Sequence, residues 1–205
     1  MTTNRRQFWL RPLLVGWLLL IPVNLVSIVA EDEMAEDATM EVVAGGLKSG
    51  DKVPNFYVRA ITGPLQSKSV CYVCRNGDRP VAMILVRRII PELETLLKGI
   101  DRVVDGHRAE GLRSFAVFVS RDSRTLLPQV QTLAFNGKIG LPMTIAAAPT
   151  EGPGFRGLPD DVAVSVVLYR DLKVRHSFSF HDDELTRESI DRVLEAARDL
   201  ATSSR

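Results

Sequence analysis

The chain has 205 residues, with 26 Lys and Arg against 25 Asp and Glu, and its formal net charge is +1. Three of its arginines fall within residues 1–30, which contain no acidic residue, so residues 31–205 carry a formal charge of −2. This balance provides no basic field for the phosphates of a nucleic acid and no acidic field that would collect cations. We therefore expect no nucleic acid among the partners.

Residues 1–30 have the composition of a secretory signal peptide. Their arginines precede an almost wholly apolar stretch at residues 13–30, which ends in Ala30, a small residue where signal peptidase would cut. The alternative is an uncleaved membrane anchor, since the stretch approaches the length that spans a bilayer, although Pro22 and Asn24 interrupt it. We predict export to the periplasm or the extracellular space, with membrane attachment only if this segment is retained.

The remainder of the chain divides into a leader and one domain. Residues 31–50 are acidic and then rich in glycine, which is typical of a flexible leader. Residues 51–205 alternate strand and helix signals and are numerous enough to bury a good hydrophobic core.

Apolar patterns within this domain predict an α/β fold. The continuous apolar run at residues 81–86 is typical of a strand buried on both faces, and the helix after it begins at Pro91, a residue suited to a first helical position. The predicted elements are strands at 56–61 and 81–86, a helix from Pro91, a strand at 115–119, a helix ending at 136–137, a strand at 141–148, a hairpin of 162–169 and 174–180, and a helix from about residue 183. Parallel crossover units thus come first, and an antiparallel pair closes the sheet.

The two cysteines of the chain stand together as Cys71-Tyr72-Val73-Cys74. Thiols are hard to keep reduced outside the cytoplasm, so two close cysteines in an exported chain favour a disulfide. The two-residue spacer is also that of dithiol redox centres, and the nearby Arg75 and Arg79 could lower the pKa of a thiolate.

Three interpretations of this pair stay open at the sequence level. A structural disulfide across so short a loop would stabilise the fold by about 2 kcal/mol, against about 4.7 kcal/mol for a loop of 100 residues. Because a structural disulfide would stabilise the fold so little, the short loop favours a redox site. A zinc site needs about four ligands, and His107, His176 and His181 do not stand at ligand spacing from the pair. We expect neither a metal nor another cofactor.

The order of the elements resembles that of the thioredoxin fold. Gly50 to Phe56 looks like the "G-x-x-x-P-x-F" opening of peroxiredoxins and exported thiol-disulfide oxidoreductases, and residues 120–123 are similar to the strand-end "S-x-D-S" of that superfamily. The likeness covers roughly residues 47–200. It implies a thioredoxin-like α/β fold, a central mixed sheet flanked by helices. It also implies thiol-disulfide exchange with other exported proteins, with Cys71 as the attacking thiol and Cys74 as the resolving thiol.

The chain departs from this superfamily in the position of its cysteines. The superfamily's dithiol follows the first central strand at the start of a long helix, whereas residues 87–92 here contain no cysteine, serine or threonine. The pair instead precedes the strand, and residues 75–80 after it predict a turn, because Gly77 and Pro80 oppose a helix. The alternative function is therefore a non-catalytic binding or structural module, in which Cys71 and Cys74 form a structural disulfide.

Two further family motifs bear on the activity. Gly157-Leu158-Pro159 resembles the "G-x-P" whose proline packs against the dithiol in cis, although Asp160 and Asp161 separate it from the next strand. The "P-x-x-x-T/S-x-x-C" segment of a peroxidatic cysteine is missing after the first central strand, so we do not expect peroxidase activity.

Other polar residues are expected to have structural roles. We predict that His107 is a half-buried residue at the end of the first long helix and that His176, on a strand face with Phe178, packs at the core edge. We expect residues 182–184, after His181, to cap the last helix and form its acidic first turn. Solvated charges at a strand end are the expectation for Arg87 and Arg88. The sequence shows no partner for the loop pair of Asp160 and Asp161.

Overall fold

The computed structural model describes residues 46–120, 122–146 and 159–203. The predicted signal segment, most of the predicted leader and the Gly/Pro-rich loop before Pro159 lie outside these ranges. The elements are β1 (Val58–Ala60), β2 (Ser69–Val70), α1 (Tyr72–Asn76), β3 (Val81–Val86), α2 (Leu93–Gly106), β4 (Arg113–Phe118), α3 (Ser123–Gly137), β5 (Met143–Ala146), β6 (Val164–Arg170), β7 (Lys173–Phe180) and α4 (Arg187–Thr202).

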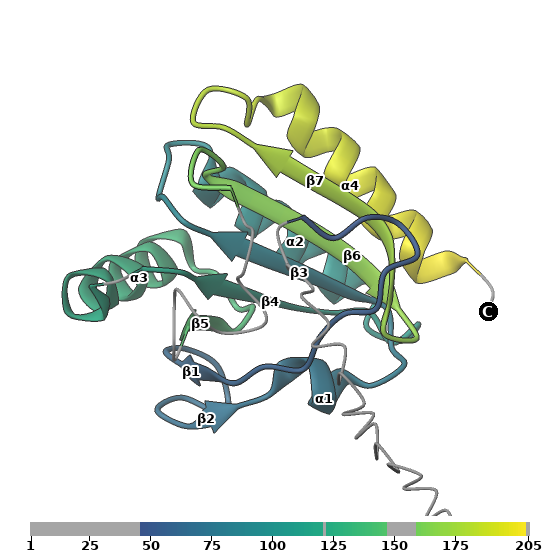
Figure 1. Cartoon of the computed structure of the whole chain (residues 1–205), viewed down its shortest axis with the longest axis horizontal. Helices are drawn as coiled ribbons and strands as arrows, with labels where there is room; N and C mark the ends of the chain where they lie inside the picture. The colour runs from purple at the N-terminus through teal and green to yellow at the C-terminus, as the bar shows by residue number, and fades with distance from the viewer. Residues whose placement is uncertain (1–45, 121, 147–158, 204–205) are drawn as a thin grey trace, which may run out of the picture. The chain divides into compact units, whose positions relative to one another are not determined.

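The strands form one mixed sheet in the order β2-β1-β5-β4-β3-β6-β7 (Figure 1). β3, β4 and β5 are parallel neighbours, while β6 runs antiparallel to β3 and forms a hairpin with β7. β1 pairs antiparallel with β5 and with β2. The predicted α/β class, with parallel units followed by a closing antiparallel pair, is confirmed.

The strand β3 lies at the centre of the fold and is buried on both faces, since none of its six side chains is more than 1% exposed. Ala82, Ile84 and Val86 face the helices. The alternate side chains Val81, Met83 and Leu85 face the other side of the sheet. The unbroken apolar sequence of this strand follows from that double burial.

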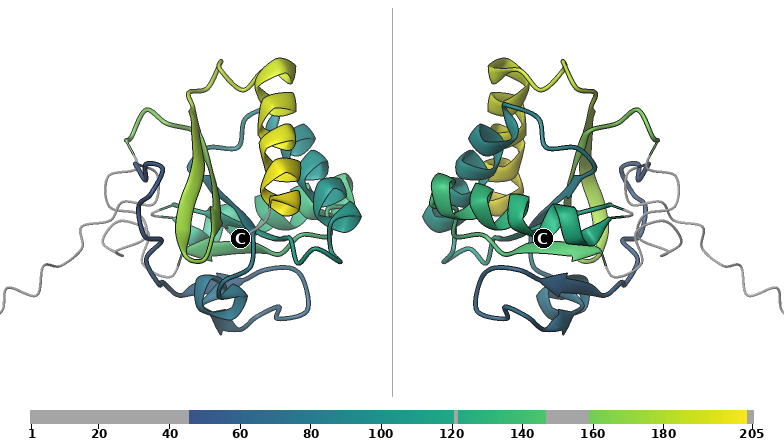
Figure 2. Two further views of the ribbon diagram at one scale, coloured as in Figure 1. Left: turned by 90° about the vertical axis from the view of Figure 1, so that its right-hand side faces the viewer. Right: turned by 90° about the vertical axis from the view of Figure 1, so that its left-hand side faces the viewer.

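Each face of the sheet has its own cover (Figure 2). α2, α3 and α4 lie on one face and bury a helix-side core, and the segment at residues 47–56 and α1 lie on the other and bury an opposite-side core. The opposite-side core consists of Leu47, Val53, Phe56, Val58, Cys71, Tyr72, Val73, Val81, Met83, Leu85, Phe115, Val117, Val119, Ala146, Val162, Val167, Tyr169 and Val174.

The "G-x-x-x-P-x-F" segment provides part of this second cover. Leu47 is 2% exposed and Phe56 is 6% exposed, and the Gly50 amide donates to the Val174 carbonyl over 2.9 Å. The last residues of the predicted 31–50 leader therefore already pack against the domain.

The "S-x-D-S" resemblance has a local structural role at the start of α3. The Asp122 side chain accepts hydrogen bonds from the backbone amides of Arg124 and Thr125 and from the Thr125 hydroxyl. The hydrogen bonds from Thr125 are the main reason that the pKa of the Asp122 carboxyl lies below its usual range. Asp122 is thus the N-cap of the helix.

Four local features differ from the predictions or were not predicted. β1 is shorter than the predicted strand at 56–61, and β2, with two residues, was missed. His176 is exposed rather than packed at the core edge. The ladder of β6 and β7 shifts register between Leu168 and Tyr169, and this bulge places Val174 in the opposite-side core while Phe178 packs against the helix-side core.

The last helix begins later than the sequence suggested. α4 starts at Arg187, and its N-cap is Thr186, whose hydroxyl accepts from the Ser189 amide while the Ser189 hydroxyl accepts from the Thr186 amide. The prediction that residues 182–184 cap this helix was wrong. Glu184 instead accepts from the His181 amide in a turn before the helix.

This reciprocal cap predicts a measurable difference between two neighbouring substitutions. Thr186→Ala removes the cap and should lower the free energy of unfolding by about 1 kcal/mol. Asp183→Ala, in the segment first expected to cap the helix, should change it by no more than about 0.5 kcal/mol. Urea denaturation of both variants checks this, and equal effects would show that Thr186 does not set the start of α4.

Candidate functional site

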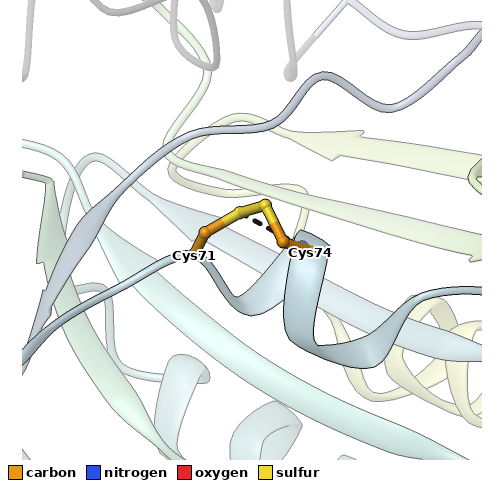
Figure 3. The surroundings of a disulfide bond; sticks show 2 residues. All are labelled: Cys71 and Cys74. Atoms are coloured by element: carbon orange, nitrogen blue, oxygen red, sulfur yellow. Dashed lines mark hydrogen bonds between the residues drawn. A yellow bond between two sulfur atoms is a disulfide. The ribbon is translucent and has the colours of Figure 1, made fainter.

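The two cysteines form a disulfide at the start of the one-turn helix α1 (Figure 3). The sulfurs are 2.02 Å apart, and the Cα atoms are 5.4 Å apart. Cys71 is the N-cap of the helix, and its Sγ accepts a hydrogen bond from the Cys74 amide at 3.1 Å. The turn predicted over residues 75–80 begins only at Gly77, because the helix continues to Asn76 and is capped by Gly77, whose φ is 56°.

The two ends of the disulfide differ in their exposure. Cys71 is 7% exposed and belongs to the opposite-side core, whereas Cys74 is exposed on the surface of α1. The two residues between them explain this orientation. Tyr72 stacks on Phe115 with ring centroids 5.1 Å apart, and Val73 is completely buried, so α1 is fixed against the sheet with Cys74 outward.

The pKa values of two tyrosines, Tyr72 in α1 and Tyr169 on β6, are raised, which favours the neutral phenol. Burial raises the pKa of Tyr72, and the positive charge of Arg75 partly offsets that effect. Burial also raises the pKa of Tyr169, and the nearby Asn76 side chain offsets that effect only in part. Both phenols stay protonated at neutral pH, so neither supplies a base next to the cysteines.

The disulfide lies at the start of α1, which precedes β3 in the chain and packs on the face of the sheet away from the long helices. The position that the resemblance assigns to a dithiol is instead the carboxyl end of β3, where the chain continues with Arg87 and Arg88. Among the described residues, both cysteines are in the disulfide and no free cysteine remains. The pair is therefore displaced, as the sequence indicates, to a helix before β3 on the face of the sheet opposite α2.

Ion pairs occupy the carboxyl end of β3. Arg88 donates through Nε to the Asp182 carboxylate at 2.7 Å and through its Nη atoms to the carbonyls of Asp160 and Asp161 at 2.8 Å and 2.6 Å. The Arg87 guanidinium lies 3.0 Å from the Asp160 carboxylate. The expectation of merely solvated charges, without partners for Asp160 and Asp161, was wrong, because the chain after residue 158 returns to this strand end.

The histidines do not join the cysteines in a site. His107 is half-buried at the end of α2, as the helical stripe predicted, with Nδ1 3.8 Å from the Glu110 carboxylate. His181 Nδ1 lies 3.1 Å from the Asp161 carbonyl. Within the described ranges, no group of three or more His, Cys, Asp or Glu side chains could hold a metal ion. The predicted motif at 157–159 lies largely outside those ranges.

The described part of the chain contains no helix that is long and apolar enough to span a membrane. The stretch at residues 13–30 was not part of that search.

Comparisons with known proteins identify the fold. No protein-family model matches the sequence, and no curated protein matches it significantly. The structure is similar to that of a candidate protein disulfide isomerase from Bacteroides thetaiotaomicron, with a TM-score of 0.58, 11% identity, and coverage of 79% of this chain and 96% of that one. A secreted thiol-disulfide isomerase from Corynebacterium glutamicum gives a TM-score of 0.56 at 13% identity, covering 74% of this chain and 86% of that one.

A peroxidoxin, BcpB from Mycobacterium tuberculosis, is also similar, with a TM-score of 0.54, 17% identity, and coverage of 77% of this chain and 99% of that one. These proteins share a mixed sheet flanked by helices with the present chain. Together with the strand order and the Cys71–Cys74 disulfide, they show that the chain has a thioredoxin-like fold.

The geometry of the short ring predicts how much the disulfide stabilises the fold. Removing the cross-link in the variant Cys71→Ala/Cys74→Ala should lower the free energy of unfolding by about 2 kcal/mol, because so short a loop loses little entropy when it is closed. Guanidinium denaturation of this variant and of the wild type with and without reductant measures the loss. A loss above about 4 kcal/mol, or a chain that does not fold without the bond, would make the disulfide a principal support of the fold.

Proposed function

We propose that this protein is exported and exchanges disulfides with other exported proteins through Cys71 and Cys74. The single observation that carries the proposal is the asymmetry of the bond, since Cys74 is exposed while Cys71 is buried and accepts the Cys74 amide hydrogen bond. Thiol-disulfide exchange requires one sulfur that a partner can reach and a leaving sulfur whose thiolate is stabilised. Cys74 meets the first requirement because it is exposed, and Cys71 meets the second because its sulfur accepts a hydrogen bond.

The proposed exchange begins at Cys74. A partner thiolate attacks the Cys74 Sγ, a mixed disulfide forms, and the bond to Cys71 breaks with its electron pair on the Cys71 sulfur. The Cys74 amide already donates to that sulfur, which favours its anionic form. A second partner thiolate then attacks the partner sulfur of the mixed disulfide and releases Cys74. The partner is oxidised to a disulfide, and Cys71 and Cys74 take up the two protons that its thiols lost.

This order of events reverses the roles that the resemblance implied. The order of the family's motif made Cys71 the attacking thiol and Cys74 the resolving one. Exposure assigns the contact with partners to Cys74 and makes Cys71 the buried resolving thiol.

Export is supported by the composition of residues 1–30 and by the disulfide itself, because such bonds persist in oxidising compartments. One of the structurally similar proteins is described as secreted.

A non-catalytic binding or structural module is the second candidate function. The observation that favours it is the position of the pair on a helix of five residues before β3, while ion pairs occupy the carboxyl end of that strand. So short a helix has few aligned peptide dipoles with which to stabilise a thiolate. In this alternative, Cys71 and Cys74 clamp α1 against the opposite-side core.

The reduction potential of the pair distinguishes the two functions. Equilibration of the chain from Glu31 onward with a thiol redox buffer should give a value near or above that of thioredoxin, about −270 mV, if the pair exchanges with proteins. A value below about −300 mV would identify a structural bond. The function would then have to lie at the surface of the domain and not at the cysteines.

Single-cysteine variants test the assigned roles. Cys71→Ser retains the exposed Cys74 and should react with the neutral reagent 4,4′-dithiodipyridine at least about 10-fold faster than Cys74→Ser, which retains the buried Cys71. The thermal melting of both variants is the control for folding. If Cys74→Ser reacts as fast or faster, the exposed sulfur is not the entry point and the order implied by the resemblance stands.

A further inference from the structure

We propose that a cavity between α1, α2 and the start of β4 binds a small organic anion, one that carries a phosphate or carboxylate group on an apolar body. The cavity has a volume of about 440 Å³, which falls within the range of small-molecule sites. No part of the proposed disulfide exchange requires it, so the two sites can be tested separately.

The charges around the cavity are strongly unequal. Four guanidinium groups line it, from Arg75, Arg79, Arg108 and Arg113, against one carboxylate, that of Asp101. Asp101 is already engaged, because it accepts a hydrogen bond from the Gly140 amide at 2.7 Å. The wall is therefore electropositive although residues 31–205 as a whole are slightly acidic.

The four arginines differ in how far the protein already uses them. Arg108 pairs with the Asp105 carboxylate at 2.7 Å, and Arg113 donates to the Leu112 carbonyl, also at 2.7 Å. Arg75 and Arg79 are exposed and form no ion pair within the described ranges. Two guanidinium groups are thus available for an incoming anion, and guanidinium binds phosphate and carboxylate in a two-pronged geometry.

The mutual effect of the arginines supports an anionic occupant. Burial lowers the pKa of Arg113, and the positive charges of Arg79 and Arg108, which line the same cavity, lower it further. A bound anion between them would replace repulsion by attraction. The proposal still rests on the cavity and its unpaired guanidinium groups.

The remaining wall is suited to an apolar body. Leu65, Leu141 and Pro142 line the cavity, and they come from two places in the chain that the fold brings together. Two wall residues, Tyr72 and Ser114, are at least nine-tenths buried and carry hydroxyls for which the described residues offer no hydrogen-bond partner. Apolar surface with a few polar groups is the usual composition of a small-molecule site.

The cavity and the disulfide use different residues of α1. Tyr72, Arg75 and Asn76 line the cavity, whereas Cys71 and Cys74 do not. Substituting the arginines therefore leaves the sulfur atoms and their hydrogen bond in place.

Phenyl phosphate is the probe for this site, in calorimetric titrations of the intact domain from Glu31 onward. The wild type should bind it saturably. Arg75→Gln/Arg79→Gln should weaken binding at least about 10-fold, because two charge-assisted contacts are lost. The matched control Arg192→Gln/Arg198→Gln removes two exposed arginines of α4 that lie away from the cavity wall, and it should change the affinity less than about 2-fold.

Two comparisons separate the parts of the proposed ligand. Inorganic phosphate, which lacks the apolar body, and benzyl alcohol, which lacks the charge, should each bind more weakly than phenyl phosphate. Absence of saturable binding to the wild type would overturn the proposal, as would equal losses in the two double variants. Equal melting temperatures of wild type and variants ensure that a loss of affinity is not a loss of folding.

Discussion

The burial of β3 on both faces is the constraint on which the rest of the structure depends. A strand whose six side chains are all buried needs a cover on each side of the sheet. Three helices cover one side (Figure 2). Among the described residues, the other side has no long helix, and its cover is assembled from an extended segment at residues 47–56 and from the single turn of α1. The short segment at residues 47–56 and the single turn of α1 are thus essential to the core.

This arrangement explains where the disulfide lies and what it contributes. Tyr72 and Val73 are the side chains with which α1 closes the opposite-side core, and the cysteines flank them in sequence. A five-residue helix is too short to persist alone, so it depends on packing and on the ring that the disulfide closes. The same orientation that buries Tyr72 exposes Cys74. The asymmetry proposed for the exchange reaction is therefore a consequence of the way the core is closed.

The parts of the fold that the sequence predicted are those with strong periodic patterns. The boundaries of β3 agree with the apolar run at 81–86, and α3 ends where Asn136 and Gly137 indicated. β2 and α1 were missed because two and five residues are too few to show a period. The start of α4 was misplaced because an acidic run resembles a first helical turn, while the actual cap, Thr186 with Ser189, uses a hydroxyl where a capping box commonly has Glu or Gln.

The sequence identified the residues of the site, but it did not show which side chains surround them. The spacing of Cys71 and Cys74 indicated a disulfide, which the structure contains. Their unequal exposure depends on contacts with Phe115, more than forty positions away in sequence, and no local pattern contains that information. The partners of Arg88 were equally hidden, because they lie 72 to 94 positions further along the chain.

The carboxyl end of the parallel strands and the surface around α1 therefore differ in what they offer a ligand. The carboxyl end, where ligands commonly bind in open α/β sheets, is occupied by ion pairs of Arg87 and Arg88 with acidic residues that follow Pro159. The cavity with two unpaired guanidinium groups lies instead beside α1 and the start of β4. Charges that are already paired leave little for a ligand to gain, whereas unpaired charges beside a cavity give an anion strong partners. On physical grounds, the surface around α1, which also carries the exposed Cys74, is where we expect this protein to meet its partners.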